Sequence, residues 1–329
     1  MTVAEQLRQA QATRLAALDP LLPPQWPAPA GEVLTAALPT GRRVAGVLTR
    51  TDNALGTLAS LWSAQLVWEL HPLVGADPRL GMDALLRAWR ARLDRVGPNA
   101  AAAGGAAGPA DSAGVVAWPS RDAEAARALL DHGFVPLSVL AVRTAENEDD
   151  TIAGAEGAAA RPAEAGAVVR RARPGDLDAA VRLAMAELSY SALVGGTIIR
   201  PDAAELKREA IGYRLHRDDP VWLAERDGLP AGLAECWLID VPPEAGPGFL
   251  VPAGRWGYVN TVAVTPAVRG EGVGRAMLAV AHRAFRRAGV RGSYLYYNPA
   301  NPLSSVFWPR QGYRPLWTIW EVRPVTAIR

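Results

Sequence analysis

Residues 258–277 read YVNTVAVTPAVRGEGVGRAM, and they decide the fold. A strand of mostly apolar residues ends at Thr265-Pro266, a turn with three glycines follows, and an amphipathic helix continues to residue 288. Because glycine has no Cβ, Gly270, Gly272 and Gly274 let the backbone adopt positive φ and approach a ligand closely. The stretch therefore predicts a strand, a glycine turn and a helix in direct succession.

The glycine turn is expected to bind an anion. The first amides of a helix have no intrahelical acceptor, and the helix dipole favours negative charge there. Arg269 and Arg275 add positive charge at the two ends of the turn. The predicted ligand is a phosphate or pyrophosphate, although these residues alone leave open a turn that only links strand to helix.

Two other nucleotide-binding designs fit poorly. A P-loop needs a lysine after its last glycine, where Arg275 stands, and the one lysine of the chain is Lys207. A dinucleotide fingerprint that starts at Gly270 needs a glycine at its sixth position, which is again Arg275, and an acidic ribose ligand near residue 293. Neither residue is present.

The rest of the C-terminal half predicts a mixed sheet. Apolar alternation and turn residues give the order β-α-α-β-β-β-α-β-α-β, with a hairpin turn at Arg226-Asp227-Gly228. This order is typical of an α/β (α+β) fold, with a mixed sheet and helices on both faces. The expected elements are strand 168–171, helices from 174 and over 201–215, strands 221–225, 229–239 and 256–264, helix 273–288, strand 293–297, helix 302–311 and strand 314–323.

A length of 329 residues predicts two domains. Residues 146–166 are acidic and rich in Ala and Gly, so they are interpreted as a linker between domains at 1–145 and 167–329. The first domain repeats landmarks of the second. Gly133-Phe134 follows a helix as Gly312-Tyr313 does, and Gly81 is expected to open a helix as Gly272 does. A divergent tandem duplication explains this repetition.

Composition excludes several classes of function. The net charge of +2 gives no electrostatic reason to expect a nucleic-acid partner, and no apolar run is long enough to cross a membrane. The single cysteine, Cys236, excludes a disulfide within the chain or a cysteine zinc cluster; it is expected to be buried and inert, and no metal is predicted. The N-terminus has no secretory signal, so a cytoplasmic protein, monomeric or homodimeric, is expected.

Two spaced motifs resemble those of the GNAT acetyltransferase superfamily. Arg269-x-x-Gly272-x-Gly274 is similar to its Q/R-x-x-G-x-G/A signature, and Asn301, Phe307-Trp308 and Gly312-Tyr313 resemble a downstream segment. The resemblance covers roughly residues 168–323. Together with the internal repeat, this resemblance implies two tandem GNAT-like folds, of which the first is degenerate. This arrangement is loosely similar to that of the mycothiol synthase family.

The resemblance implies acetyl-CoA as the co-substrate. Backbone amides of the glycine turn would bind the CoA pyrophosphate, the end of the preceding strand would pair with the pantetheine arm, and the following helix would contact that arm. The residues implied are Val262, Val264, Arg269, Gly270, Gly272, Val273, Gly274, Arg275, Asn301 and Ser304. In this family the amine attacks the thioester directly, so positioning dominates the rate.

The acid and base of many relatives are absent. The usual carboxylate position holds Tyr258, and the usual tyrosine position holds Trp308. Removing a proton from a lysine-like amine at pH 7 costs about 4.6 kcal/mol, whereas an α-amino-like group costs about 1 kcal/mol. We therefore expect either an acceptor amine of low pKa or a base on a neighbouring strand. Glu235 is the candidate, with Tyr258 positioning a water; an ion-paired Glu235 and a Tyr258 that only packs are the alternatives.

The N-terminal copy is not expected to bind CoA. Matching Gly81 to Gly272 puts Pro78 at the position of Arg269 and Asp83 at that of Gly274, and a carboxylate there would repel a pyrophosphate. Two histidines of the C-terminal half, His216 and His282, are expected to be exposed.

The sequence thus predicts an N-acetyltransferase that transfers an acetyl group to a primary amine of a small molecule. Two alternatives remain: an acyl-CoA-binding regulatory module without catalysis, and a protein N-acetyltransferase.

Overall fold

The computed structural model describes residues 3–22, 29–101, 111–144, 166–243 and 250–329. The predicted linker, 146–166, lies outside these residues except for Gly166. Contacts between Cα atoms divide the chain into two units. Unit 1 comprises Met1–Leu140, Pro243–Pro252 and Pro315–Arg329, and unit 2 comprises Ala141–Pro242 and Ala253–Arg314.

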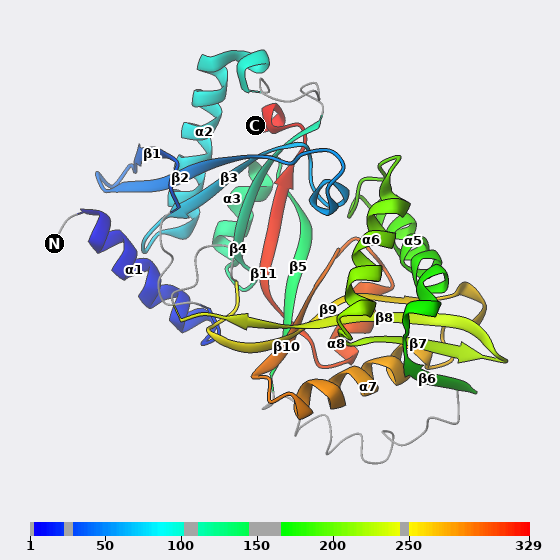
Figure 1. Cartoon of the computed structure of the whole chain (residues 1–329). Coiled ribbons are helices and arrows are strands. Elements are labelled where there is room, and N and C mark those ends of the chain that lie inside the picture. The colour runs from blue at the N-terminus through cyan, green and yellow to red at the C-terminus, as the bar shows by residue number, and fades with distance from the viewer. Residues whose placement is uncertain (1–2, 23–28, 102–110, 145–165, 244–249) are drawn as a thin grey trace. The chain divides into compact units, whose positions relative to one another are not determined.

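Unit 1 contains a sheet with strand order β1-β2-β3-β4-β11-β5. The last strand of the chain, drawn in red, lies between β4 and β5 (Figure 1). It pairs antiparallel with β4 from Trp317↔Pro119 to Val322↔Gly114. The sequence assigned this strand to the second domain, but its pairing places it in unit 1. The bounds are α1 Val3–Leu18, β1 Glu32–Ala37, β2 Arg43–Asp52, β3 Leu66–Leu73, α2 Pro78–Ala101, β4 Ser112–Pro119, α3 Ala123–Asp131, β5 Val135–Thr144 and β11 Arg314–Val322.

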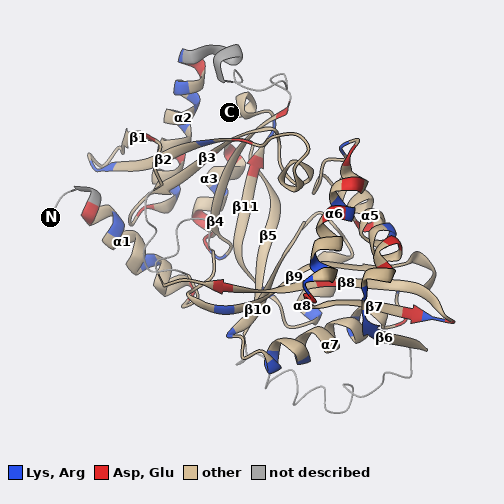
Figure 2. Ribbon diagram, in the orientation of Figure 1, with Lys and Arg blue, Asp and Glu red and all other residues tan. Residues whose placement is uncertain are grey.

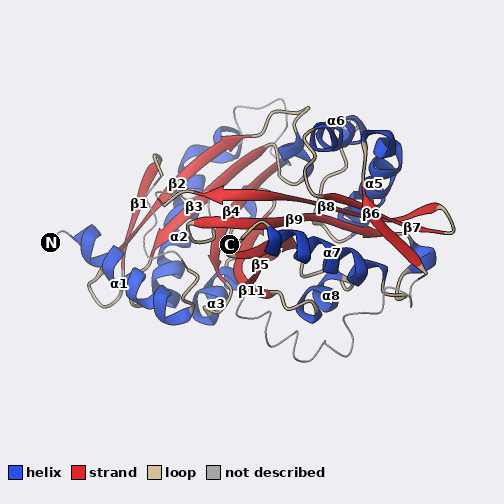
Figure 3. Ribbon diagram, turned by 60° about the horizontal axis from the view of Figure 1, so that its bottom comes forward, coloured by secondary structure: helices blue, strands red, loops and turns tan. Residues whose placement is uncertain are grey.

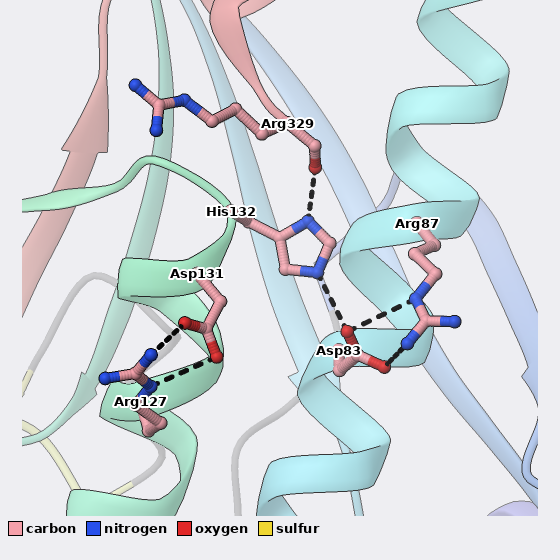
Figure 4. A network of polar contacts seen from close by, with 6 residues as sticks. All are labelled: Asp83, Arg87, Arg127, Asp131, His132 and Arg329. Atoms are coloured by element: carbon pink, nitrogen blue, oxygen red, sulfur yellow. Dashed lines mark hydrogen bonds and ion pairs between the residues drawn. The ribbon is translucent and has the colours of Figure 1, made fainter.

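The core of unit 1 forms between this sheet and the helices α2 and α3. The predicted apolar face of α2 is confirmed, since Leu85, Leu86 and Trp89 are fully buried. The C-terminus is held beside α3: His132 Nδ1 lies 2.5 Å from the carbonyl oxygen of Arg329, and His132 Nε2 lies 3.0 Å from Asp83 of α2 (Figure 4).

The start of α2 differs from the prediction. The helix begins at Pro78, so Gly81 lies within its first turn and does not precede it. A Cβ at Gly81 would lie 2.7 Å from Val74 Cβ, so glycine is needed there for close packing. The matching of Gly81 to Gly272 was wrong, because the close approach of Val74, and not a ligand turn, requires this glycine.

Unit 2 contains a sheet of order β6-β7-β8-β9-β10, antiparallel except for the β9–β10 pair. Helices α5 and α6 lie on one face, and α7 and α8 lie on the other (Figure 3). The predicted mixed α/β fold and the predicted order of elements are confirmed. The bounds are β6 Ala167–Arg171, α5 Leu177–Leu193, α6 Ala203–His216, β7 Val221–Arg226, β8 Leu229–Val241, β9 Gly254–Val264, α7 Val273–Arg287, β10 Gly292–Tyr297 and α8 Ser304–Arg310.

The predicted hairpin turn between β7 and β8 is also confirmed. Asp227 and Gly228 both have positive φ, 53° and 76°, which is the geometry of a type I′ turn. Charged residues of both signs alternate along α5 and α6 (Figure 2). None of the helices that the structure describes is both long and apolar enough to cross a membrane.

Candidate active site

The glycine turn of unit 2 has the geometry that its sequence predicts. Gly270 and Gly272 have φ of +84° and +89°, in the left-handed region that favours glycine. The first backbone hydrogen bond of α7 runs from Ala276 N to Gly272 O, at 3.0 Å. The amides of Val273, Gly274 and Arg275 precede that bond, so they have no acceptor within the helix and can bind an anion.

The space around the turn suits a ligand. A Cβ placed on Gly270 would meet no atom within 4 Å, so the turn is open on that side. A Cβ on Gly274 would lie 3.3 Å from Phe307 of α8, so this glycine is needed for the contact between α7 and α8. The three glycines therefore have different roles: two allow the conformation of the turn, and one allows helix packing.

The charge at the turn is net positive. Glu271, within the turn, forms an ion pair with Arg226 of β7. Arg269 donates from Nε to Val264 O at 3.1 Å, and its guanidinium lies 5.5 Å from the ring centre of Tyr190. Arg275 is exposed beside the turn. Because Arg226 neutralises the one carboxylate, the charges of Arg269 and Arg275 remain available to a phosphate.

Strands β9 and β10 separate just before the turn. Their parallel pairing begins at Trp256↔Gly292 and ends at Val259↔Leu295, although β9 continues to Val264. On its other edge β9 pairs with β8 as far as Val264↔Gly232. The part of β9 that carries Val262 and Val264 thus has no pairing with β10, and apart from Val264 O, which accepts from Arg269, an extended ligand can pair with it there.

A β-bulge marks the point of separation. In the β8–β9 pairing, Glu235 faces Thr261 and Cys236 faces Val259, so Asn260 is the extra residue. Bulges of this kind change the direction in which side chains point, and they are frequent beside active sites.

Glu235 lies beside this bulge and is buried, with 2% of its surface exposed. Its Oε2 accepts a hydrogen bond from Asn260 Nδ2 at 2.8 Å, and its Oε1 lies 3.1 Å from Arg214 Nε of α6. The Arg214 guanidinium in turn lies over the indole of Trp237, 3.3 Å from the ring centre. The structure therefore has the ion-paired Glu235 that the sequence left open as the alternative to a base.

Two charged residues that sequence reasoning missed, Glu187 and Lys207, lie near this site. Glu187 of α5 accepts a hydrogen bond from Ser191 Oγ at 2.5 Å. Burial raises the pKa of Glu187, the nearby positive charge of Lys207 lowers it, and the negative charge of Glu235 raises it further. Lys207 of α6 is only 2% exposed. Together with Glu235 and Arg214, these residues form what we call the α5–α6 polar cluster.

The sequence did contain a signal for Lys207. It lies in an i, i+4 row with Ala203, Ile211 and Leu215, all of which are buried. A lysine in an otherwise apolar row is expected to point inward toward a partner.

Tyr258 lies in an aromatic group at the same end of the sheet. Its ring centre is 4.6 Å from that of Trp237, 4.9 Å from that of Tyr294 and 6.3 Å from that of Tyr296. Burial, followed by the neighbouring tyrosines, raises the pKa of the Tyr258 phenol well above its usual range. The phenol is neutral at physiological pH, so it can donate or accept hydrogen bonds but cannot act as a phenolate base.

Asn301 caps α8. Its Oδ1 accepts hydrogen bonds from the backbone amides of Leu303, at 3.0 Å, and Ser304, at 3.2 Å. This cap fixes the start of the helix that carries Phe307 and Trp308. Trp308 is buried against Tyr313, with ring centres 5.6 Å apart.

The expectation for His282 was wrong. Its side chain is buried, at 8% exposure, and its Nε2 lies 3.0 Å from the Tyr313 hydroxyl. Burial, with the nearby Arg143 and Arg286, lowers the pKa of His282 to about 3. His216 is exposed, as predicted.

Cys236 is fully buried, and burial raises the pKa of its thiol, which fits the predicted inert side chain. Within the described ranges, no group of three or more His, Cys, Asp or Glu residues could hold a metal ion.

Comparison with known proteins shows the family of the segment that contains this site. Residues 186–313 match the family described as "Acetyltransferase (GNAT) family". This segment is a GNAT acetyltransferase domain. It begins within α5, ends at Tyr313, and contains the glycine turn, the separated strands and the α5–α6 polar cluster, so the resemblance seen in the sequence is confirmed.

One of the similar solved structures shares the fold of nearly the whole chain. A GCN5-related N-acetyltransferase from Sphaerobacter thermophilus is similar over 98% of this chain and 94% of its own, with 16% identity and a TM-score of 0.53. This likeness extends beyond the GNAT domain to nearly the whole chain. A GCN5-related N-acetyltransferase from Ralstonia eutropha JMP134 is 22% identical over 46% of this chain and 94% of its own, with a TM-score of 0.37. No curated protein sequence matches this chain.

Proposed function

We propose that the GNAT domain transfers an acetyl group from acetyl-CoA to a primary amine of a small molecule. The observation that carries this proposal is the positive-φ turn at Gly270 and Gly272, which follows the unpaired edge of β9 directly. The CoA pyrophosphate binds the amides of Gly270, Gly272, Val273, Gly274 and Arg275, with Arg269 and Arg275 supplying positive charge. The backbones of Val262 and Val264 pair with the pantetheine arm, and Asn301 and Ser304 contact it from α8.

The reaction is a direct displacement. The neutral amine attacks the thioester carbonyl, a C–N bond forms, and the C–S bond breaks to release CoA thiolate. An ammonium substrate loses one proton before attack and a second as the amide forms, and the thiolate takes up one proton. One proton therefore needs an acceptor on the protein or in bound water.

The two carboxylates of the α5–α6 polar cluster have separate roles in this reaction. Glu235, which is ion-paired with Arg214, positions the acceptor through Asn260, and Tyr258 would position a water there. Burial raises the pKa of Glu187, and this carboxylate is the proposed proton acceptor.

The α5–α6 polar cluster also supports a small acceptor. It supplies two carboxylates and two cations, Arg214 and Lys207, so its charges nearly balance. An acceptor with one ammonium group and a further polar group can interact with both the carboxylates and the cations of this cluster.

The test is an acceptor screen with acetyl-CoA. The protein is incubated with a panel of small primary amines and with lysine-containing and free N-terminal peptides, while free thiol release and acetylated products are measured. Acetylated small amines support the proposal. CoA binding without thiol release from any acceptor would show a regulatory module, and acetylation of peptides alone would show a protein N-acetyltransferase.

A further inference from the structure

The end of α5 is closed by a Schellman motif. Gly195 has a φ of +77°, which favours glycine, and its amide donates to Ala192 O at 3.1 Å. The amide of Gly196 donates to Ser191 O at 2.9 Å, so the loop that leads to α6 folds back onto the last turn of α5. This ending holds residues 194–196 close to Ser191.

Asn298, which follows β10, contacts this loop. Its Nδ2 donates to Val194 O at 3.3 Å. A Cβ at Gly196 would lie 3.0 Å from Asn298 Nδ2 and 3.3 Å from Asn298 Cβ, so the absence of a side chain at residue 196 allows the two segments to approach each other. Asn298 and Gly196 therefore form a close contact between the α5–α6 loop and the loop that leads from β10 to α8.

The same asparagine organises the start of α8. Asn298 Oδ1 accepts a hydrogen bond from Ala300 N at 2.7 Å, and its carbonyl oxygen accepts one from Asn301 N at 3.0 Å. Asn301 in turn caps α8 through the amides of Leu303 and Ser304. Asn298 is thus bonded on one side to the turn that carries the proposed pantetheine contacts and on the other side to the end of α5.

Ser191 connects this contact to the proposed proton acceptor. Its carbonyl oxygen accepts from Gly196 N, and its hydroxyl donates to Glu187 Oε1 at 2.5 Å, one turn earlier in α5. Both hydrogen bonds depend on the position of the last turn of α5, and the contact with Asn298 restrains that turn against local opening. A continuous set of contacts thus joins the cap of α8 to Glu187 through Asn298 and Ser191.

We propose that Asn298 is a positioning residue that transmits the binding of CoA at α8 to the end of α5. When the pantetheine arm contacts Asn301 and Ser304, the turn at 298–301 loses freedom, and the contact of Asn298 extends this restriction to residues 187–200. Coupling of this kind needs no change of the average structure, because a ligand that reduces opening of one segment also reduces opening of the segment bonded to it. Glu187 is then held most firmly when the acyl donor is bound. This inference rests on the proposed function.

Hydrogen exchange of the full chain with and without CoA tests the proposal. The amides of Val194, Gly195 and Gly196 report on opening of the end of α5, because each donates to a carbonyl in the last turn of that helix. Saturating CoA, with its binding measured by calorimetry, should slow exchange directly in residues 270–277 and, through Asn298, in residues 187–200. The slowing expected in residues 187–200 is about fivefold or more.

Two variants remove the contact from opposite sides. Asn298→Asp keeps an acceptor for Ala300 N, but its carboxylate has no N–H to donate to Val194 O. Gly196→Ala brings no change of charge, and its Cβ would displace the Asn298 amide. In both variants CoA should still protect residues 270–277, and its effect on residues 187–200 should disappear.

Thr197→Val is the matched control, because it removes a hydrogen bond of the same loop, from Thr197 Oγ1 to Leu188 O at 3.0 Å, that does not involve Asn298. It should speed exchange of residues 187–200 in the free protein and preserve the slowing by CoA. The inference is overturned if CoA does not protect residues 187–200 of wild type, if this protection persists in Asn298→Asp, or if Thr197→Val loses it as well. Each of these results leaves the proposed cofactor site intact, whereas failure of CoA to protect residues 270–277 would contradict the proposed function itself and this inference with it.

Discussion

The carboxylate of Glu235 accepts a hydrogen bond from the side chain of Asn260, the residue that bulges out of β9. This bond connects the point where β9 leaves β10 to the α5–α6 polar cluster. In the proposed reaction the thioester carbonyl lies at this separation, and the acceptor amine approaches from the cluster. The pair therefore links the cofactor edge to the acceptor side.

The two carboxylates should respond differently to amide replacement. Glu187→Gln removes the proposed proton acceptor, so kcat/KM should fall by about 10²–10⁴-fold, and by least for acceptors of low pKa. Glu235→Gln should mainly raise KM, and it should also destabilise the fold by about 1–3 kcal/mol, because Arg214 loses one charged partner but keeps Asp219. Initial rates between pH 6 and 9, together with denaturant unfolding, measure both effects.

Glu205→Gln is the matched control, because Glu205 lies on the exposed side of α6. It should leave both rate and stability unchanged. Full activity of Glu235→Gln across this pH range would remove Glu235 from the mechanism, and full activity of Glu187→Gln would do the same for Glu187.

Two glycine substitutions separate backbone strain from cofactor binding. Gly272 and Gly228 both have positive φ, +89° and +76°, so alanine at either should destabilise the fold by about 1–2 kcal/mol. A Cβ at 272 would lie 3.2 Å from Arg275 Nη2, whereas one at 228 would meet nothing within 4 Å. Calorimetry with CoA should therefore show a loss of at least tenfold for Gly272→Ala and none for Gly228→Ala. Equal affinities in the two variants would contradict the proposed pyrophosphate site.

Local signals explain which parts of the fold could be predicted. The turns at 227–228 and 270–272 require positive φ, and glycine at these positions shows that requirement in the sequence itself. The order of elements in unit 2 could also be predicted, because the periodicity of apolar residues and the turn residues are local signals as well. The pairing of β11 with β4 has no such local signature, because it joins residues about 200 positions apart, and it could therefore not be predicted from the sequence.

The site was predicted less completely than the fold. The glycine turn and Glu235 were found from motif and strand position, but the contribution of α5 and α6 was not. Glu187 looks like an ordinary helical carboxylate until its burial is known. His282 had a readable signal, since it lies in one row with Leu278 and Phe285, both buried, on the apolar face of α7. The prediction that His282 is exposed was wrong because it relied on the polarity of histidine and not on this periodicity.

Gln11 should stabilise unit 1 through its two hydrogen bonds to the edge of β3. Gln11→Leu leaves Pro72 O and Val74 N without this partner, so the free energy of unfolding should fall by about 1–3 kcal/mol. Gln9→Leu, at an exposed position of α1, serves as the control and should change stability by less than about 0.5 kcal/mol. Denaturant unfolding measures both, and equal effects would show that α1 does not seal this edge.

The buried His282 should make the protein less stable in mild acid. The imidazole is neutral in the folded state, and its Nε2 shares a hydrogen bond with the Tyr313 hydroxyl, which in turn shares one with Ser293 Oγ at 2.8 Å. The folded pKa is about 3 and the unfolded pKa is about 6.5, so below pH 6.5 the unfolded chain binds a proton that the folded chain does not. Stability from this group is complete above pH 6.5 and falls by about 1.4 kcal/mol per pH unit on acidification. Between pH 7 and 5, wild type should lose roughly 2 kcal/mol more than His282→Gln, whereas the surface variant His216→Gln should follow wild type. Denaturant unfolding at several pH values measures these slopes, and parallel slopes for wild type and His282→Gln would show that His282 is protonated in the folded protein.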